Sequence, residues 1–365
     1  MDFGLSPDQV LLQDTLTRML AEQAPLERVR RYAEQNEDRA GDVWDATVEL
    51  GLSGLVIEEA YGGAGLGLVE AALAAETLGA HVAPVPFIAT GVVVPLALQE
   101  GGSEAQRDRW LPRLTSGACI AGLALSEHSG AREDARITSE QDRLSGRALF
   151  TLDHAADAYL VADTAGALYL VEAHAAGLTR IDLTTVDRSR RTGELCFDNT
   201  PAERLAGSDA ALTRRCLDRA RVLLAADTLG AAQHMLNAAV DYAKQREQFG
   251  RVIGSFQAVK HMCAEMAAAL EPCRAMVWYA AYALEALPDE AHLTACHTKA
   301  HLSEVGKSVA RTATEVHGGM GFTDLLGLHY WFKRIGLNRQ LLGSPERLRH
   351  EAALAQGLVD GIGET

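Results

Sequence analysis

Three long segments with apolar residues at helical spacing fill the second half of this chain, and they constrain its fold most strongly. They run from Ser208 to Gly250, from Ser255 to about Leu287, and from about 291 to Val316. A Ser-Asp pair suits the start of the first segment, and a serine cap is expected to open the second. Helices of this length bury their apolar faces against one another, so residues 207–365 are predicted to form a four-helix-bundle domain.

The pattern changes twice before this bundle. Residues 1–118 are predicted to form helices joined by short loops, beginning with Ser6 as a cap and Pro7 in the first turn. Residues 119–206 hold short apolar runs separated by polar turns, which indicates a mostly antiparallel β domain. The predicted fold class is therefore α+β, mainly α, with an N-terminal helical domain, a middle β domain and a C-terminal helical bundle.

Composition narrows the possible partners. The formal net charge of −15 argues against nucleic acid or an anionic membrane surface. No apolar run reaches the roughly 18 residues of a membrane span, and the N-terminus lacks a secretory leader pattern. The six cysteines show no C-x-x-C pair and no metal-ligand spacing, so we expect buried thiols and no metal. These features predict a cytoplasmic protein.

A basic cluster at the break between the first two long segments is unexpected in an acidic chain. Arg246 lies at the end of one helix, where its charge complements the helix dipole, and a solvated helix end is the simplest interpretation. However, Phe256 and Gln257 follow in the first turn of the next helix, where free backbone N–H groups can bind an anion. An arginine, an aromatic ring and an amide together suit a diphosphate beside a planar ring.

The segment Glu315 to Phe322, "EVHGGMGF", follows the third long segment. Its paired glycines, Gly318 and Gly319, allow the backbone to approach a ligand closely, although a helix cap and turn explains them equally well.

Together these two stretches resemble the acyl-CoA dehydrogenase family of flavoproteins. The pattern R-x-x-F-G-x-x-[IL]-x-x-F-Q is matched from Arg246 to Gln257, "HGGMGF" is similar to the Gly-Gly-x-Gly-Phe turn of the family, and "YGGAG" at 61–65 resembles its N-terminal loop. The α-β-α order fits along the whole chain. The resemblance implies a tetramer that oxidises an acyl-CoA thioester to 2-enoyl-CoA, with FAD as hydride acceptor and an electron-transfer flavoprotein as electron acceptor.

The resemblance also assigns residues to ligands. FAD of a neighbouring subunit would contact the first long helix break and the glycine turn, while Ser126 and Phe150 would lie at the chain's own flavin. The cofactor-binding candidates are therefore Arg246, Gln248, Phe249, Ile253, Phe256, Gln257, Glu315, Gly318, Gly319, Ser126 and Phe150. Asp218 and Arg221 form the family's Asp-x-x-Arg pair beside the acyl thioester and pantetheine, although a local ion pair explains them as well.

The sequence differs from the family at the positions of the catalytic base and in the segments that hold the flavin ring. Removal of the α-proton needs a carboxylate, and the family places a glutamate at one of two positions. Here those positions hold Ala220 and Leu342. In the β domain, the flavin-covering loop has become "SEHSGARE" (126–133), and the threonine expected to bond the flavin is displaced to Thr151. Strand alternation places Thr151 on the face opposite Phe150.

Other carboxylates are weaker candidates for the base. Asp227 lies two turns beyond Ala220, at about 10 Å. Glu315 replaces the family's usual glutamine, and Glu346 is expected to face solvent. His317 and His329 are expected to be packing or surface residues.

Three interpretations follow. The first is an acyl-CoA dehydrogenase subunit with FAD and acyl-CoA at sites between subunits, and whether the chain is catalytic alone is left open. The second is the non-catalytic, base-lacking subunit of a heteromeric tetramer that completes the FAD site of a second dehydrogenase-like chain. The third is a flavin monooxygenase or nitroalkane-oxidising relative on the same fold. The acyl group is not encoded in any single residue. A bulky or branched acyl chain, such as a sterol side chain, is a guess by analogy.

Overall fold

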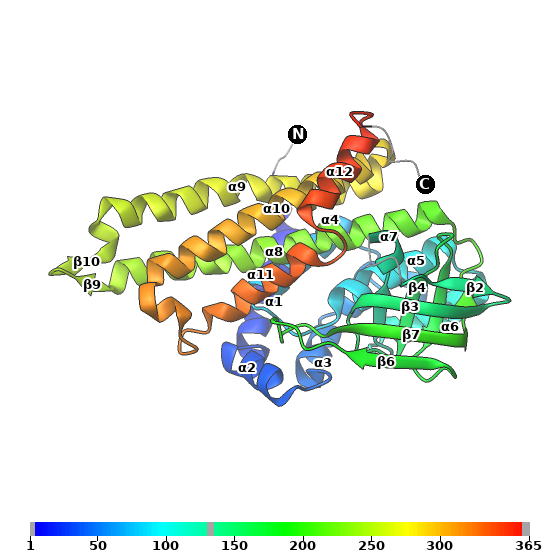
Figure 1. Cartoon of the computed structure of the whole chain (residues 1–365). Helices are drawn as coiled ribbons and strands as arrows, with labels where there is room; N and C mark the ends of the chain where they lie inside the picture. The colour runs from blue at the N-terminus through cyan, green and yellow to red at the C-terminus, as the bar shows by residue number, and fades with distance from the viewer. Residues whose placement is uncertain (1–3, 130–134, 360–365) are drawn as a thin grey trace.

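The computed structural model describes residues 4–129 and 135–359, and it shows helical segments before and after a large sheet that lies at one end of the molecule (Figure 1). The Ser6 hydroxyl accepts from the Gln9 backbone N–H at 3.2 Å, so the predicted cap is confirmed. The N-terminal helices are α1 (Pro7–Gln23), α2 (Leu26–Gln35), α3 (Gly41–Glu49), α4 (Leu68–Ala80), α5 (Val94–Gly101) and α6 (Glu104–Thr115), with short helical turns at Leu52–Gly54, Glu59–Tyr61 and Phe87–Val93.

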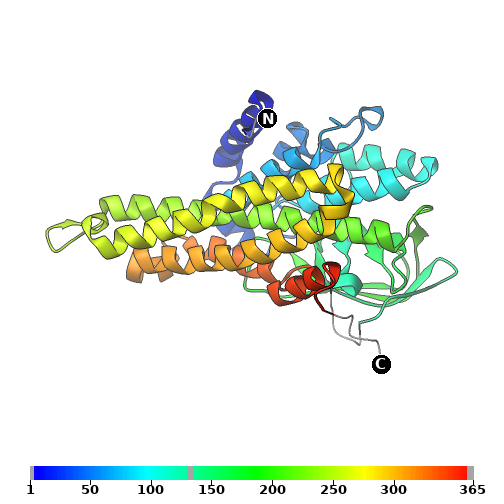
Figure 2. The ribbon, with the colours of Figure 1, turned by 90° about the horizontal axis from the view of Figure 1, so that it is seen from above.

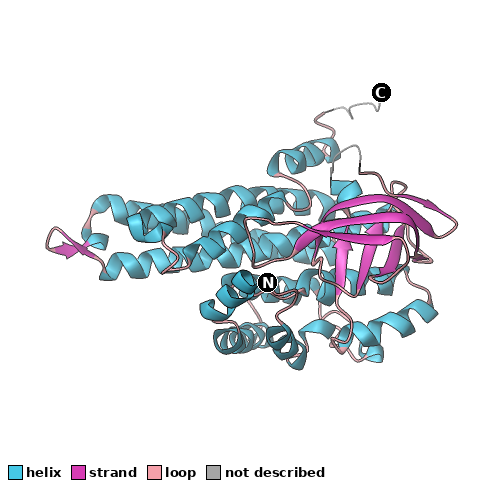
Figure 3. Ribbon diagram, turned by 60° about the horizontal axis from the view of Figure 1, so that its bottom comes forward, coloured by secondary structure: helices cyan, strands magenta, loops and turns pink. Residues whose placement is uncertain are grey.

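The middle of the chain forms an eight-stranded sheet at one end of the molecule (Figure 3). Its strands are β1 (Ala121–Ala124), β2 (Thr138–Glu140), β3 (Arg143–Leu152), β4 (Ala158–Ala162), β5 (Leu168–Glu172), β6 (Leu178–Asp182), β7 (Thr192–Pro201) and β8 (Glu203–Arg204). The order is β6-β7-β3-β1-β4-β5-β8, with β2 paired to β3. Among the described strands, β1 and β4 pair in parallel and the other pairs are antiparallel, which confirms a mostly antiparallel domain. Strands β2 and β6 are largely exposed and lack an apolar run, so the sequence pattern did not reveal them.

The last part of the chain is dominated by three long helices. These are α8 (Ala210–Gln245), α9 (Gln257–Ala286) and α10 (Pro288–His317), followed by α11 (Leu328–Gln340) and α12 (Pro345–Ala355). The Asp209 side chain caps α8 by accepting from the Leu212 N–H at 2.7 Å. With the helical and β domains in the predicted order, the predicted fold class is confirmed.

The break between α8 and α9 differs from the sequence expectation. Helix α8 ends at Gln245, and a short hairpin of β9 (Glu247–Gln248) and β10 (Arg251–Val252) follows. Phe249 and Gly250 form its turn with φ of 54° and 73°. The prediction that Ser255 caps α9 is wrong, because its hydroxyl donates to the Val252 carbonyl at 2.7 Å and Phe256 occupies the cap position.

Close helix packing joins the N-terminal domain to the bundle. A Cβ on Gly79 of α4 would lie 2.0 Å from the Asp227 carbonyl oxygen of α8, and one on Gly230 would lie 1.8 Å from the Glu76 carbonyl oxygen. Only glycine permits this reciprocal contact.

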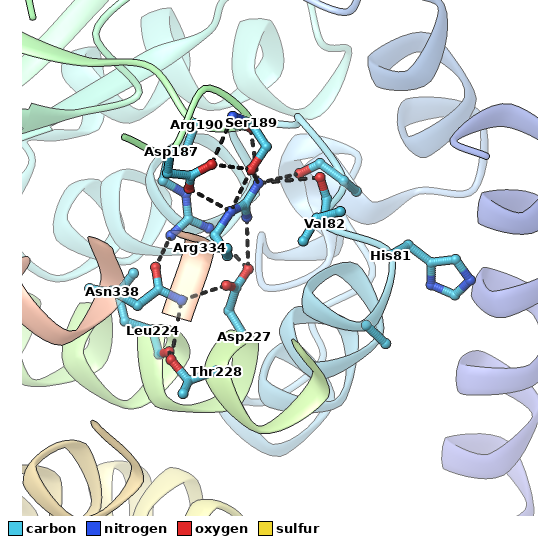
Figure 4. Close-up of polar contacts among 12 residues, drawn as sticks. His81, Val82, Asp187, Ser189, Arg190, Leu224, Asp227, Thr228, Arg334 and Asn338 are labelled. Carbon is cyan, nitrogen blue, oxygen red and sulfur yellow. Dashed lines mark hydrogen bonds and ion pairs between the residues drawn. The ribbon is translucent and has the colours of Figure 1, made fainter. Parts of the chain in front are cut away.

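A buried network of charged side chains connects all three domains (Figure 4). Arg334 of α11 contacts Asp187 of the β6–β7 loop and Asp227 of α8, both at 3.1 Å, and also the Val82 carbonyl oxygen. Arg190 contacts the same Asp227 carboxylate at 3.0 Å. Because Asp227 is buried and already bound by two arginines, its role is structural, and it is not free to act as a base.

In the described part of the chain, none of the helices has the length and the apolar composition that crossing a membrane requires.

Candidate functional site

The β9–β10 hairpin projects from one end of the bundle, far from the sheet (Figures 1 and 2). Phe249 at its tip is 93% exposed. Its ring meets Phe256 edge to face, with centroids 6.2 Å apart, and the Arg251 guanidinium lies 4.0 Å from the centroid of the Phe256 ring. Among the described residues, the Arg246 guanidinium has no hydrogen-bond or ion-pair partner. The end of α8 and the hairpin therefore present an unpaired charge at Arg246 and a largely exposed aromatic ring at Phe249.

The other cofactor-binding candidates in and beside the hairpin are also at least partly exposed. Gln248 and Gln257 are exposed, and Ile253 is half-buried. Gln257 is the first residue of α9, so its turn has the free backbone N–H groups that the sequence predicted.

The glycine turn lies at the same end of the bundle. Tyr242 near the end of α8 packs on His317 at the end of α10, with ring centroids 4.6 Å apart. His317 is buried, which agrees with its expected packing role. Gly318 adopts φ of 58°, and the space around Gly318 and Gly319 is open. The exposed Glu315 lies one turn earlier, in a groove that also contains Lys307 and Arg311.

The Asp218–Arg221 pair lies deep inside the molecule, and the predicted ion pair is present at 3.2 Å. Arg221 has no exposed surface. Its guanidinium also contacts the Glu351 carboxylate of α12 at 2.8 Å and donates to the Leu342 carbonyl oxygen at 2.9 Å. His292 of α10 completes the group with an Nδ1–Asp218 distance of 2.9 Å.

Ala220 and Leu342, the two positions where the resemblance predicts a catalytic base, lie beside this arginine. Ala220 is adjacent to Arg221 in α8 and is fully buried. Leu342 has φ of 58°, and its side chain is 7% exposed. Because Arg221 binds the Leu342 carbonyl, the loop in which the family carries one of its glutamates is fixed by a buried cation. The Glu346 carboxylate, four residues beyond Leu342, is exposed and pairs with Arg339 at 2.9 Å. Its position agrees with the expectation that Glu346 faces solvent.

The β-domain candidates lie at the sheet end of the molecule. The buried Ser126 hydroxyl accepts from the Leu149 N–H at 3.0 Å. Phe150 is 55% exposed with φ of 51°, next to a break in the β3–β7 register. Thr151 is fully buried, and its hydroxyl has no partner among the described residues. Residues 130–134 of the predicted flavin-covering loop lie outside the described residues.

Two clefts flank the start of α8. The larger, about 780 Å³, extends between α5, α8 and the α9–α10 junction and is lined by Arg214, Asp218 and His292 among others. The smaller, about 440 Å³, reaches Arg221 and Glu351 and is also lined by Arg214 and His292. His292 therefore stands between the two clefts.

Comparison with known proteins decides the family. The profile described as "Acyl-CoA dehydrogenase, N-terminal domain" matches residues 6–118, and the profile "Acyl-CoA dehydrogenase, C-terminal domain" matches residues 207–356. The chain belongs to the acyl-CoA dehydrogenase family. The resemblance inferred from the hairpin and the glycine turn is thereby confirmed.

Among curated relatives, the chain is 31% identical over 345 residues to "Acyl-CoA dehydrogenase IpdE2" of Mycobacterium tuberculosis, covering 93% of this chain and 95% of that protein. It is 27% identical to "Acryloyl-CoA reductase (NADH)" of Anaerotignum propionicum, covering 88% of this chain and 87% of that protein.

Solved structures give the same result. A variant of the "Tcur3481-Tcur3483 steroid ACAD" superposes with a TM-score of 0.88 at 31% identity, covering 96% of this chain and 98% of that one. The ChsE4-ChsE5 complex of M. tuberculosis superposes with a TM-score of 0.91 at 23% identity, covering 99% of this chain and all of its match, which shows a shared fold.

Sequence reasoning did not find several members of the buried clusters. His292, Cys296 and Glu351 join Asp218 and Arg221, and Arg190 and Arg334 join Asp227. The only available signal was that an arginine or a carboxylate inside an apolar helix pattern needs a buried partner.

Proposed function

We propose that this chain is the base-lacking subunit of a heteromeric acyl-CoA dehydrogenase. In this proposal it completes the FAD site of a second dehydrogenase-like chain. One observation carries the proposal. Arg221 binds the Leu342 backbone at the position of the family's glutamate, while Arg246 has no partner among the described residues.

The hairpin residues fit FAD. An unpaired guanidinium at Arg246 is suited to a diphosphate, and the exposed Phe249 can cover a ring edge. The open backbone at Gly318 and Gly319 permits close approach of the same cofactor. Gln248, Ile253, Phe256, Gln257 and Glu315 would complete this surface.

The chain's own flavin cradle fits less well. Thr151 is fully buried whereas Phe150 is 55% exposed, so the Thr151 hydroxyl is less accessible to a flavin than the Phe150 ring is. Ser126 already accepts a backbone N–H. These features support one working flavin environment per pair of chains, built on the partner.

The proposed chemistry is α,β-dehydrogenation of an acyl-CoA thioester. FAD held at this surface would supply the acceptor for the β-hydrogen. A carboxylate of the partner chain removes the α-proton, since here Asp218, Asp227 and Glu351 are each bound by arginine. Asp218, which lines the larger cleft, and Arg221, which the smaller cleft reaches, would lie beside the thioester end of the substrate.

The substrate class is proposed from the relatives. The 31% identical structure is titled a steroid ACAD, and its name joins two chains. We therefore propose a bulky, steroid-derived acyl group, a heterotetramer and an electron-transfer flavoprotein as electron acceptor.

The proposal is tested by expressing this chain alone and together with a dehydrogenase-like chain encoded by a neighbouring gene. The co-expressed complex should contain FAD and oxidise an acyl-CoA, and Arg246→Ala in this chain should remove FAD from the complex. If the chain alone forms a tetramer with one FAD per subunit and oxidises an acyl-CoA, the proposal is wrong.

A second candidate is a chain active on its own with Glu315 as the base. The exposed carboxylate beside the glycine turn favours it. Activity of the isolated chain that disappears in Glu315→Gln, with FAD retained, would establish this candidate instead.

A further inference from the structure

Helix α12 packs on the outside of α10 and forms one wall of the smaller cleft, which reaches the buried Arg221 (Figure 1). Its Glu351 and Leu354 side chains line the cleft, whereas Leu348 and Ala352 pack on α10. We propose that α12 is a hinged lid over this cleft, held shut by the ion pair between Glu351 and Arg221. The inference does not depend on the proposed function.

The ion pair that would hold the lid is bidentate. Arg221 Nη1 lies 2.8 Å from Glu351 Oε2, and Arg221 Nη2 lies 3.2 Å from Glu351 Oε1. The Arg221 side chain has no exposed surface and that of Glu351 is 17% exposed, so solvent ions screen the pair weakly. Paired bonds of this kind are strong and fix the orientation of the two groups.

Each member of the pair has a second partner that stays with it when the lid opens. Arg221 keeps Asp218, which is 3.2 Å away on the same helix. Glu351 keeps Arg347 of its own helix, at 2.8 Å. Opening therefore leaves neither a buried cation nor a carboxylate without an opposite charge, which avoids the usual cost of breaking a buried ion pair. Both the closed and the open arrangement are electrostatically compensated.

The hinge lies in the loop between α11 and α12. Leu342 and Gly343 both adopt positive φ, of 58° and 113°, and this conformation is uncommon for leucine. Arg221 Nε donates to the Leu342 carbonyl oxygen at 2.9 Å, so the same guanidinium fixes the pivot and holds the lid. A few residues at the end of an element commonly absorb the backbone change when a lid moves.

Little apolar contact opposes the motion. Leu348 and Ala352 form a small buried cluster with Cys296 and Ala300 of α10, and this cluster is separate from the main hydrophobic core. Helix α12 has 11 residues, a length at which an isolated helix is marginal in water. A lid that leaves α10 should therefore lose part of its helical hydrogen bonding, and hydrogen exchange detects that loss.

The closed lid limits what reaches the floor of the cleft. Arg214 and His292 line the cleft beside Arg221, which makes its lining largely basic. Because Arg221 is fully buried and bound by Glu351, an anionic ligand in the cleft reaches this guanidinium after α12 opens. The Glu351 carboxylate thus acts as an autoinhibitory contact.

Hydrogen exchange of the full chain tests the lid, in complex with its partner chain if that is its purified form. In the wild type, the amides of α12 should exchange together and well before those of α10. Glu351→Gln should speed exchange in α12 at least about tenfold, because the closed state loses a charged hydrogen bond. Helix α10 should stay protected.

Glu346→Gln is the matched control. Glu346 belongs to the same helix and pairs with Arg339 of α11 at 2.9 Å, but its side chain is 66% exposed, so the pair contributes little. This substitution should speed exchange in α12 by about threefold or less. Equal effects of the two substitutions would overturn the proposal. So would an α12 as well protected as α10 in both the wild type and Glu351→Gln.

Entry of a thiol reagent into the cleft gives a second readout. Leu217 lines the cleft and is 4% exposed. In Leu217→Cys, maleimide should label the introduced thiol at least about tenfold faster when combined with Glu351→Gln than with Glu346→Gln. The native Cys273, buried in α9 away from the cleft, reports global unfolding and should stay unlabelled in both. Equal labelling rates in the two backgrounds, or labelling together with Cys273, would contradict a lid.

Discussion

The two ends of helix α8 contrast in how far the fold uses their polar groups. At Arg221, near the start of the helix, every part of a buried guanidinium is engaged by Asp218, Glu351 and Leu342. About 25 residues later, or about 37 Å along the helix axis, Arg246 extends from the helix end without a partner among the described residues. A saturated, buried arginine is committed to stability, whereas an unpaired, exposed one is available to a ligand.

The largest expected effect is on stability, at Arg221. Arg221→Met leaves the buried Asp218 carboxylate without its arginine and removes one of the two arginines that bind Glu351, so it should lower the free energy of unfolding by about 3–5 kcal/mol. Urea denaturation measures it. Arg347→Met is the control, because Arg347 pairs with Glu351 at the surface, and it should cost at most about 1 kcal/mol. Equal effects of the two variants would contradict the assigned difference.

The next effect is on cofactor binding, at Arg246. Arg246→Ala should weaken FAD binding by the complex by about 1.5–3 kcal/mol, the contribution of a charged hydrogen bond. Flavin absorbance per chain after gel filtration measures it. Lys244→Ala removes an exposed charge from the last turn of the same helix and should retain FAD. Loss of FAD in both variants would indicate a general charge effect instead.

A pH effect on stability is expected at Lys299, a buried residue of helix α10. Burial lowers the pKa of Lys299 to about 7, and among the described residues its ammonium group donates to the Asn338 carbonyl and the Ser303 hydroxyl. Between about pH 7 and 10, the unfolded state binds a proton that the folded state lacks. Stability should therefore rise with pH there, by about 1 kcal/mol per pH unit.

Lys299→Met should remove this rise, as measured by thermal melting across that pH range. Lys307→Met, at an exposed position of the same helix, is the control and should keep it. An unchanged pH profile in Lys299→Met would show that another group titrates.

The smallest expected change is the stability of the hairpin variant Phe249→Ser. With 93% of the side chain exposed, the substitution should change the free energy of unfolding by less than about 0.5 kcal/mol. The same variant should lose FAD from the complex. A marked drop in melting temperature of the isolated chain would mean that Phe249 packs within its own fold.

Much of the fold followed from local pattern. Cap residues such as Ser6 and Asp209, and apolar spacing within α8 to α10, mark helices whose signals lie within a few residues. The hairpin was missed, with α8 expected to continue to Gly250. Its two paired residues per strand contain too little apolar pattern to distinguish them from a helix end.

The sequence by itself determined the helix lengths, the β domain between helical domains, and the motif from Arg246 to Gln257 with its family. The tertiary structure alone decided which charges are available. Arg221 meets Leu342 and Glu351, about 120 and 130 residues away, because a buried charge must be compensated by whatever the fold brings beside it. That requirement acts through space and leaves no fixed spacing in the sequence. Consequently the Arg246 motif could be read directly, while the group of Asp218, His292, Cys296 and Glu351 could not.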